Sequence, residues 1–137
     1  MDSLTDLSYN EVSNMKINIL FINSEQETDS LTNIISIPQT VDSKLNLLEF
    51  FSKKMNFPDY FGYNWDSFYD TLLDDSWINK NEINLLHPQL PLLPPEDLKI
   101  YFEIINDLVK NNDNSVKILR FVFYQKDQLE IERYFRN

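Results

Sequence analysis

The sequence contains no cysteine, one glycine and one histidine among its 137 residues. Without cysteine the protein forms no disulfide, offers no thiolate to a metal ion and has no thiol for catalysis. The sequence also lacks any apolar run close to the roughly 18 residues of a membrane span. Its first residues are acidic and carry no apolar segment typical of a signal peptide, so we expect a cytoplasmic protein.

Positive charge is scarce as well. Lysine and arginine total 12 against 22 aspartate and glutamate residues, which gives a net charge of -10 at pH 7 and a pI near 4.4. Such a negative field disfavours nucleic acids and anionic membranes and attracts basic partners, although an acidic composition also serves solubility alone. The length and the 42% hydrophobic content predict one domain over residues 15–137, preceded by a loose arm over residues 1–14.

Strand and helix signals alternate along the chain, and helices between strands imply right-handed crossovers and a largely parallel sheet. The predicted fold class is α/β: a small, mainly parallel, three- to four-stranded sheet flanked by helices, with an extra N-terminal edge strand. The first two strands could pair as a hairpin, which would make that edge antiparallel. The predicted elements are strands at 16–22 and 31–37, helices at 43–55 and from 65 onward, a strand at 82–86, a helix at 95–111, a strand at 116–124 and a helix at 126–135.

The single glycine lies in the most distinctive stretch, residues 57–74, which reads FPDYFGYNWDSFYDTLLD. A chain that uses glycine once needs it for a positive φ angle or for a close approach of the backbone, and we expect one of these at Gly62. Pro58 disfavours a helical conformation at the residue before it. The preceding helix should therefore end near Met55 or Asn56.

A new helix begins inside this stretch. Asn64 is a good N-cap residue, and Trp65 is then the first helical residue. At helical spacing Trp65, Phe68 and Leu72 share one face of this helix. We expect that face to be buried.

Three aspartates, Asp66, Asp70 and Asp74, recur at every fourth position on another face. They repel one another by about 0.2–0.5 kcal/mol per pair, and a solvated helix face is the plainest explanation of such a stripe. Exposed tyrosines beside carboxylates, however, are typical of a surface that binds a cationic partner. The tyrosines that border the stripe are Tyr60, Tyr63 and Tyr69.

A known family shows this pattern. The segment 57–70 resembles the signature loop and second helix of the barstar family, small intracellular proteins that inhibit secreted ribonucleases. The resemblance covers roughly residues 33–123 and implies a small parallel sheet flanked by helices. The residues that carry it are Pro58, Tyr60, Gly62, Asn64, Asp66 and Asp70.

In that family the loop and the second helix block the active-site cleft of the ribonuclease, which implies the same role here. The chain departs from the best-known member by a strand before the shared region, a tail after it and a proline-rich connection at 90–95. It is therefore similar to a longer branch of barstar-like proteins. Two neighbours on the same surface, Tyr63 and Asp74, are added to the contacts that the resemblance assigns. The expected partner-binding residues are Tyr60, Tyr63, Asn64, Asp66, Tyr69, Asp70, Asp74 and Asp107.

The aspartates suggest how such an inhibitor would work. Asp66 and Asp70 stand about one helical turn apart, so their carboxylates can take the places of phosphate oxygens and pair with Arg, Lys or protonated His. Charge pairs of this kind also speed association by long-range steering. We predict a non-catalytic inhibitor of a basic ribonuclease, of the immunity type, which needs no cofactor or metal and is a monomer until it binds.

An enzyme would need a nucleophile, an acid–base pair or a metal. The one histidine, His87, sits beside Pro88 at a strand end, where histidine is more often structural. Asp66 and Asp70 could hold Mg²⁺, but nothing else in the sequence completes such a site. Paired carboxylates could also serve glycoside hydrolysis, but a domain of 137 residues offers little substrate cleft. The stronger alternative is a non-catalytic interaction module that binds another basic protein through the same face.

Overall fold

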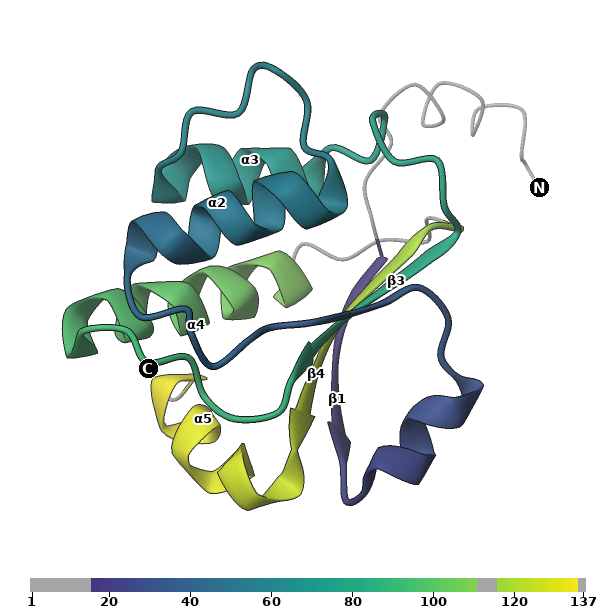
Figure 1. The fold of residues 1–137 in the computed structure, drawn as a ribbon, viewed down its shortest axis with the longest axis vertical. Helices are drawn as coiled ribbons and strands as arrows, with labels where there is room; N and C mark the ends of the chain where they lie inside the picture. Colours follow the sequence, from purple (N-terminus) through teal and green to yellow (C-terminus); the bar gives the residue numbers. More distant parts are fainter. Residues whose placement is uncertain (1–15, 111–115, 136–137) are drawn as a thin grey trace.

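The computed structural model describes residues 16–110 and 116–135, so the arm predicted at residues 1–14 lies outside the described residues. The succession of strands and helices confirms the predicted order (Figure 1). A 3₁₀-helix also forms between the first two strands, where the sequence predicts only a connection. The elements are β1 (Lys16–Ile22), η1 (Glu25–Ser30), β2 (Ile34–Ser36), α2 (Lys44–Met55), α3 (Trp65–Leu73), β3 (Glu82–His87), α4 (Pro95–Lys110), β4 (Ile118–Tyr124), η2 (Gln125–Asp127) and α5 (Gln128–Phe135).

The described strands form one parallel sheet in the order β1-β4-β3-β2. This confirms the predicted fold class, with β4 in the interior of the sheet and β1 at one edge. The predicted hairpin is wrong, because β1 and β2 lie at opposite edges and β1 pairs with β4 in parallel, from Lys16 opposite Ile118 to Ile22 opposite Tyr124. The segment after β1 carries the chain across the sheet instead of turning back beside it.

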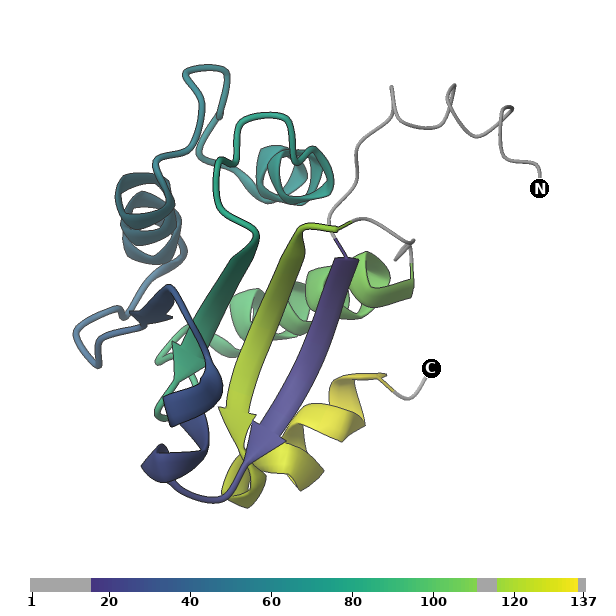
Figure 2. The same ribbon diagram turned by 90° about the vertical axis from the view of Figure 1, so that its right-hand side faces the viewer.

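The α-helices lie on one face of the sheet, and η1 lies on the other side (Figure 1, Figure 2). Right-handed crossovers explain this arrangement. The chain steps from β2 to β3 to β4 in one direction across the sheet, which places α2, α3 and α4 on the same face. The step from β1 to β2 runs in the reverse direction, so its connecting segment falls on the opposite face.

Aromatic rings fill the space between the helices and the sheet. Phe51 of α2 stacks on Phe68 of α3 with ring centroids 5.3 Å apart, and on Tyr101 of α4 at 6.4 Å. Phe121 of β4 lies against Tyr101 at 6.5 Å. These side chains are fully buried. The cluster therefore fixes α3 relative to the sheet, and α3 carries Asp66, Tyr69 and Asp70 of the candidate site.

Helical and strand periodicity predict most buried residues but err at the ends of elements. Leu45 is at helical spacing with Leu48 but is 51% exposed, because the buried face of α2 begins at Leu47. Val116 is 81% exposed, because β4 begins only at Ile118. The first error extends the buried face into the exposed first turn of α2, and the second extends the strand beyond its first residue.

Candidate partner-binding surface

The loop between α2 and α3 is a turn with its phenylalanines inward. It starts at Asn56, which ends α2 where predicted and adopts the left-handed conformation at φ 60°. Phe57 and Phe61 are buried and pack edge to face with centroids 4.8 Å apart. The N–H of Phe61 donates to the carbonyl of Pro58 at 3.0 Å, and Tyr60 inside this turn is left 59% exposed.

Gly62 has no positive φ angle, and of the two expectations the structure supports the close approach of its backbone. Its N–H donates to Oγ of Ser67 at 2.8 Å, and a Cβ atom on Gly62 would lie 3.3 Å from Nδ2 of Asn64. The positive φ falls on Tyr63 instead, at 56°, in a region that costs a non-glycine residue about 1–2 kcal/mol. The ring of Tyr63 packs on Phe61 with centroids 4.8 Å apart, which offsets part of that cost.

Asn64 is the N-cap residue of α3, as predicted. Its Oδ1 accepts a hydrogen bond from the N–H of Ser67 at 2.8 Å, and its Nδ2 donates to the carbonyl of Gly62 at 3.3 Å. The side chain therefore joins the loop to the first turn of the helix and satisfies one of its free N–H groups. Asn64 is also exposed and therefore accessible to a partner. The contact itself stays a prediction.

The helix α3 turns one face to the core and another to solvent. Phe68 and Leu72 are fully buried and Trp65 is half-buried, which confirms the predicted inner face. Asp66 and Asp70 are both exposed. Since residues four apart lie one above the other on a helix, these carboxylates share one outward side.

Asp74 follows the last helical residue, and its side chain turns toward the loop. The hydroxyl of Tyr60 donates to Oδ2 of Asp74 at 2.8 Å, and the N–H of Ser76 donates to Oδ1 at 2.9 Å. Asp74 is the C-cap residue of α3 and is half-buried. The structure thus connects the loop before α3 with the end of α3 through one carboxylate, a link that the four-residue spacing of the aspartates does not predict.

The pKa values of this pair follow from the contact. Partial burial, the hydrogen bond to Asp74 and the charges of Asp74 and Asp70 raise the pKa of Tyr60 to about 12. Partial burial alone would raise the pKa of Asp74, but hydrogen bonds from Ser76 and Tyr60 and the charge of Lys117 hold it below its ordinary value. At neutral pH Tyr60 is therefore a hydrogen-bond donor and Asp74 a carboxylate.

Tyr69 and Asp107 lie at the margins of this surface. Tyr69 is half-buried and packs against the hydrophobic core, so part of its ring is available to a partner. Asp107 is exposed on α4, and α4 packs beside α3 (Figure 1). Its place in a shared interface with the α3 aspartates stays a prediction.

The connection after α3 folds back onto the domain. Ile78 is buried, and the indole Nε1 of the half-buried Trp77 donates to the carbonyl of Thr71 at 2.9 Å. Nζ of Lys117 donates to the carbonyls of Asp75 and Ile78 at 3.0 and 2.7 Å. Sequence reasoning missed Lys117, because it acts on residues about forty positions away and no local pattern points to it.

A comparison with protein families identifies the family of the chain. The model of the family described as Barstar (barnase inhibitor) matches residues 37–124, more than half of the chain. The chain belongs to this family. The matched range contains the loop, α3 and α4 and ends with β4, so β1 and α5 lie outside it. No curated protein matches the chain.

The barstar family consists of protein inhibitors and not of enzymes. His87, the one histidine, is fully buried and hydrogen-bonded, as a structural histidine is. Among residues 16–110 and 116–135, no group of three or more His, Asp or Glu side chains could hold a metal ion. Within the same residues, no helix has both the length and the apolar character of a membrane span.

Proposed function

We propose that this protein inhibits a basic ribonuclease by covering its active site with loop 57–64 and the outward side of α3, which together we call the acidic surface. The observation that carries the proposal is the joint placement of exposed Tyr60, anchored on Asp74, and exposed Asp66 and Asp70. Membership of the barstar family supports the same kind of partner.

The chemistry of the acidic surface suits a cleft that binds phosphate. Asp66 and Asp70 offer carboxylates that accept charge-assisted hydrogen bonds from Arg, Lys or protonated His, the groups that a ribonuclease aims at its substrate. Tyr60 and the exposed part of Tyr69 can fill the volume that a base occupies in the substrate. The net charge of -10 attracts a basic enzyme over a distance and speeds encounter.

The loop is held in shape before a partner arrives. Hydrogen bonds from Gly62 to Ser67 and from Tyr60 to Asp74 fix it to both ends of α3. A preformed loop loses less conformational freedom on binding, which leaves more of the contact energy as affinity. We expect the free protein to be a cytoplasmic monomer that needs no cofactor.

The proposal is tested by capture at low salt from the lysate and secretome of the host. Wild-type bait is run beside the Asp66→Ala/Asp70→Ala double variant. A matched control, Glu25→Ala/Asp29→Ala, removes the same charge from exposed positions of η1, on the other side of the sheet. We expect the wild type and the control to retain a basic protein that the double variant loses.

The captured protein is then assayed for RNA cleavage with and without the bait. Inhibition at equal molar amounts would support the proposal. Capture of a basic protein without ribonuclease activity would replace it by the alternative, an interaction module that uses the same surface. Equal capture by the wild type and the Asp66→Ala/Asp70→Ala variant would show that the acidic surface is not the site.

A further inference from the structure

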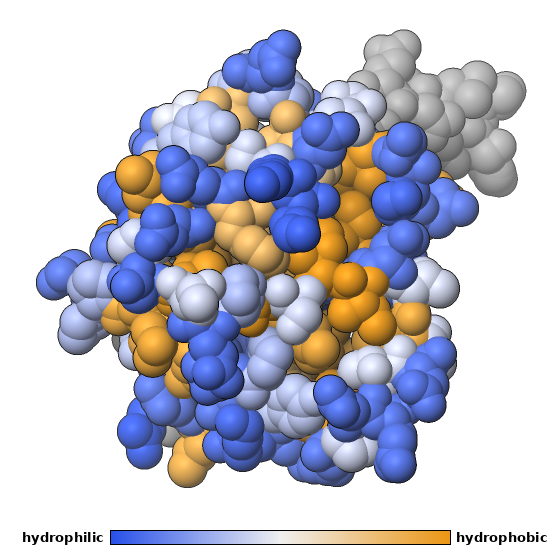
Figure 3. Space-filling view, viewed as in Figure 1, coloured by the Kyte–Doolittle hydropathy of each residue, from blue (hydrophilic) through white to orange (hydrophobic). Residues whose placement is uncertain are grey.

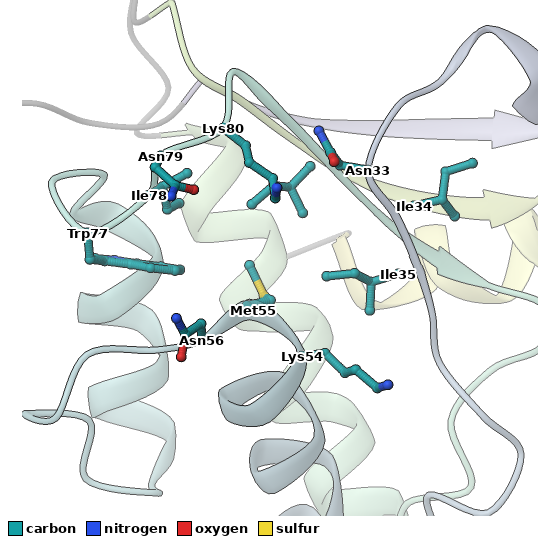
Figure 4. Close-up of a pocket in the computed structure, with 11 residues that line it drawn as sticks. Asn33, Ile34, Ile35, Lys54, Met55, Asn56, Trp77, Ile78, Asn79 and Lys80 are labelled. Carbon is teal, nitrogen blue, oxygen red and sulfur yellow. The ribbon is translucent and has the colours of Figure 1, made fainter.

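A concave feature lies apart from the exposed carboxylates of α3. A cavity of about 250 Å³ opens between the end of α2, the connection after α3 and the first residues of β2 and β3 (Figure 4). Its inner lining is apolar and comes from Ile35, Met55, Ile78 and Ile83, and Trp77 forms one side. Figure 4 shows the side chains of Ile35, Met55, Ile78 and Trp77 arranged around the space.

The polar lining of the cavity is positive. Lys54 and Lys80 belong to it together with asparagines, and none of its residues is acidic, although acidic residues outnumber basic ones 22 to 12 in the chain. Both lysines are exposed, and among the described residues neither forms an ion pair. In Figure 4 Lys80 reaches across the upper edge of the cavity, whereas Lys54 projects outward from α2. Lys80 is therefore the ammonium group at the opening.

Hydrogen bonds hold the two sides of the cavity apart. On one side, the bond from Trp77 to the carbonyl of Thr71 and the bonds from Lys117 fix the connection 74–81. On the other side, Nδ2 of Asn33 donates to the carbonyl of Glu82 at 3.0 Å. These bonds hold each side of the cavity in place, and the cavity is present in the free protein.

We propose that this cavity binds a small organic carboxylate, with its apolar body between Trp77 and the isoleucines and its carboxylate at Lys80. The volume is below the roughly 300–1,000 Å³ of pockets for drug-sized ligands, which indicates a smaller ligand with one apolar group. A carboxylate at the opening can accept a charge-assisted hydrogen bond from Lys80, which a neutral apolar molecule cannot, and a simple anion would leave the cavity unfilled. The proposal does not rest on ribonuclease inhibition.

The test is a titration of the ¹⁵N-labelled full chain with 3-phenylpropionate, followed by NMR. The chain has two tryptophans, so the indole N–H signal of Trp65 serves as an internal control for that of Trp77. We expect the Trp77 indole signal and the amide signals of Ile35 and Ile83 to shift saturably at millimolar ligand. The Trp65 signal should stay in place. A Trp77 signal that does not move would overturn the proposal.

Two further comparisons, one of ligands and one of variants, test whether the ligand carboxylate pairs with Lys80. The neutral analogue 3-phenylpropanol has the same apolar body, and acetate has the carboxylate alone; both should bind more weakly than 3-phenylpropionate. Lys80→Gln should weaken 3-phenylpropionate about threefold to fivefold, as expected for one partly exposed ion pair. Lys53→Gln, which removes an exposed charge beside the cavity but outside its lining, should not. Equal binding of the alcohol, or equal effects of the two substitutions, would contradict an anion site.

Discussion

The hydroxyl of Tyr101 on α4 donates a hydrogen bond to Nε2 of His87 at the end of β3, with 2.7 Å between the two atoms. The direction follows from the other ring nitrogen. Nδ1 faces the carbonyl oxygens of Leu85 and Val122 at 3.0 and 3.2 Å, so Nδ1 carries the hydrogen and Nε2 accepts. Complete burial lowers the pKa of His87 to about 4, and the imidazole is neutral in the folded protein at neutral pH.

Acid should therefore destabilise the fold between about pH 6.5 and pH 4. The unfolded imidazole binds a proton with a pKa of 6.5 and the folded one only near 4, so the stability linked to this group is complete above 6.5 and is lost as the pH falls toward 4. The difference corresponds to about 3 kcal/mol. Urea unfolding at a series of pH values measures it.

The variant His87→Gln isolates this effect, because the chain contains one histidine. It should be less stable than the wild type at pH 7 but should lose most of the pH dependence between 6.5 and 4. If the variant keeps the full slope in this range, other groups cause the acid sensitivity and the assignment to His87 is wrong.

Tyr101→Phe should lower the free energy of unfolding by about 1–3 kcal/mol, because it leaves a buried acceptor on His87 without its donor. Burial also raises the pKa of Tyr101 well above its ordinary value, so the donor is present throughout the accessible pH range. Denaturant unfolding at pH 7 gives the change. The control Tyr124→Phe alters a half-buried tyrosine at the end of β4 and should stay within about 0.5 kcal/mol of the wild type.

Glu82 should stabilise the fold, and this effect should be lost in a more acidic pH range than that of His87. Its Oε2 accepts from the N–H of Thr32 at 3.0 Å and from Nδ2 of Asn84 at 2.8 Å, and it pairs with Arg120 at 3.1 Å. These contacts outweigh partial burial and lower the pKa of Glu82 from 4.5 to about 2. Its stabilising effect is therefore complete above pH 4.5 and is lost as the pH falls toward 2.

Glu82→Gln should cost about 2 kcal/mol at pH 7, because it removes a charged partner from a half-buried network. The free energy of unfolding of this variant should also fall less steeply below pH 4.5 than that of the wild type. Glu49→Gln, at an exposed position of α2, is the control and should leave both quantities near the wild-type values. A variant that is acid-sensitive to the full wild-type extent would contradict the role of Glu82.

Sequence patterns predict those features of the fold that depend on contacts between residues close together in the chain. The cap at Asn64, the buried stripe from Phe68 to Leu72 and the order of the elements all follow from spacing and side-chain chemistry within a few residues. The pairing of β1 with β4 does not, because it depends on contacts a hundred residues apart. Likewise, four-residue spacing places Asp74 in a stripe with Asp70, but it cannot show that the helix ends first and that Asp74 turns to Tyr60.

Asp70→Ala should weaken partner binding more than any other single substitution on the acidic surface, by about 2 kcal/mol or more, as buried charged anchors of interfaces do. Asp70 is exposed in the middle of the outward side of α3, with Asp66 one turn before it. Competition binding with the ribonuclease identified by capture measures the loss. A change within about 0.5 kcal/mol would place Asp70 among the neutral contacts that every interface contains.

Asp74→Asn should act on the partner through Tyr60, because both carboxylate oxygens of Asp74 already accept hydrogen bonds within the protein. In the free protein this substitution removes a nearby charge, so the pKa of Tyr60 should fall from about 12 toward its ordinary 10, which NMR titration of the Tyr60 ring detects. Asp59→Asn, beside Tyr60 in sequence and exposed, is the control. In a double-mutant cycle, Asp74→Asn should weaken binding in the wild-type background and have little effect in Tyr60→Phe. An equal loss in both backgrounds would instead show that Asp74 contacts the partner directly.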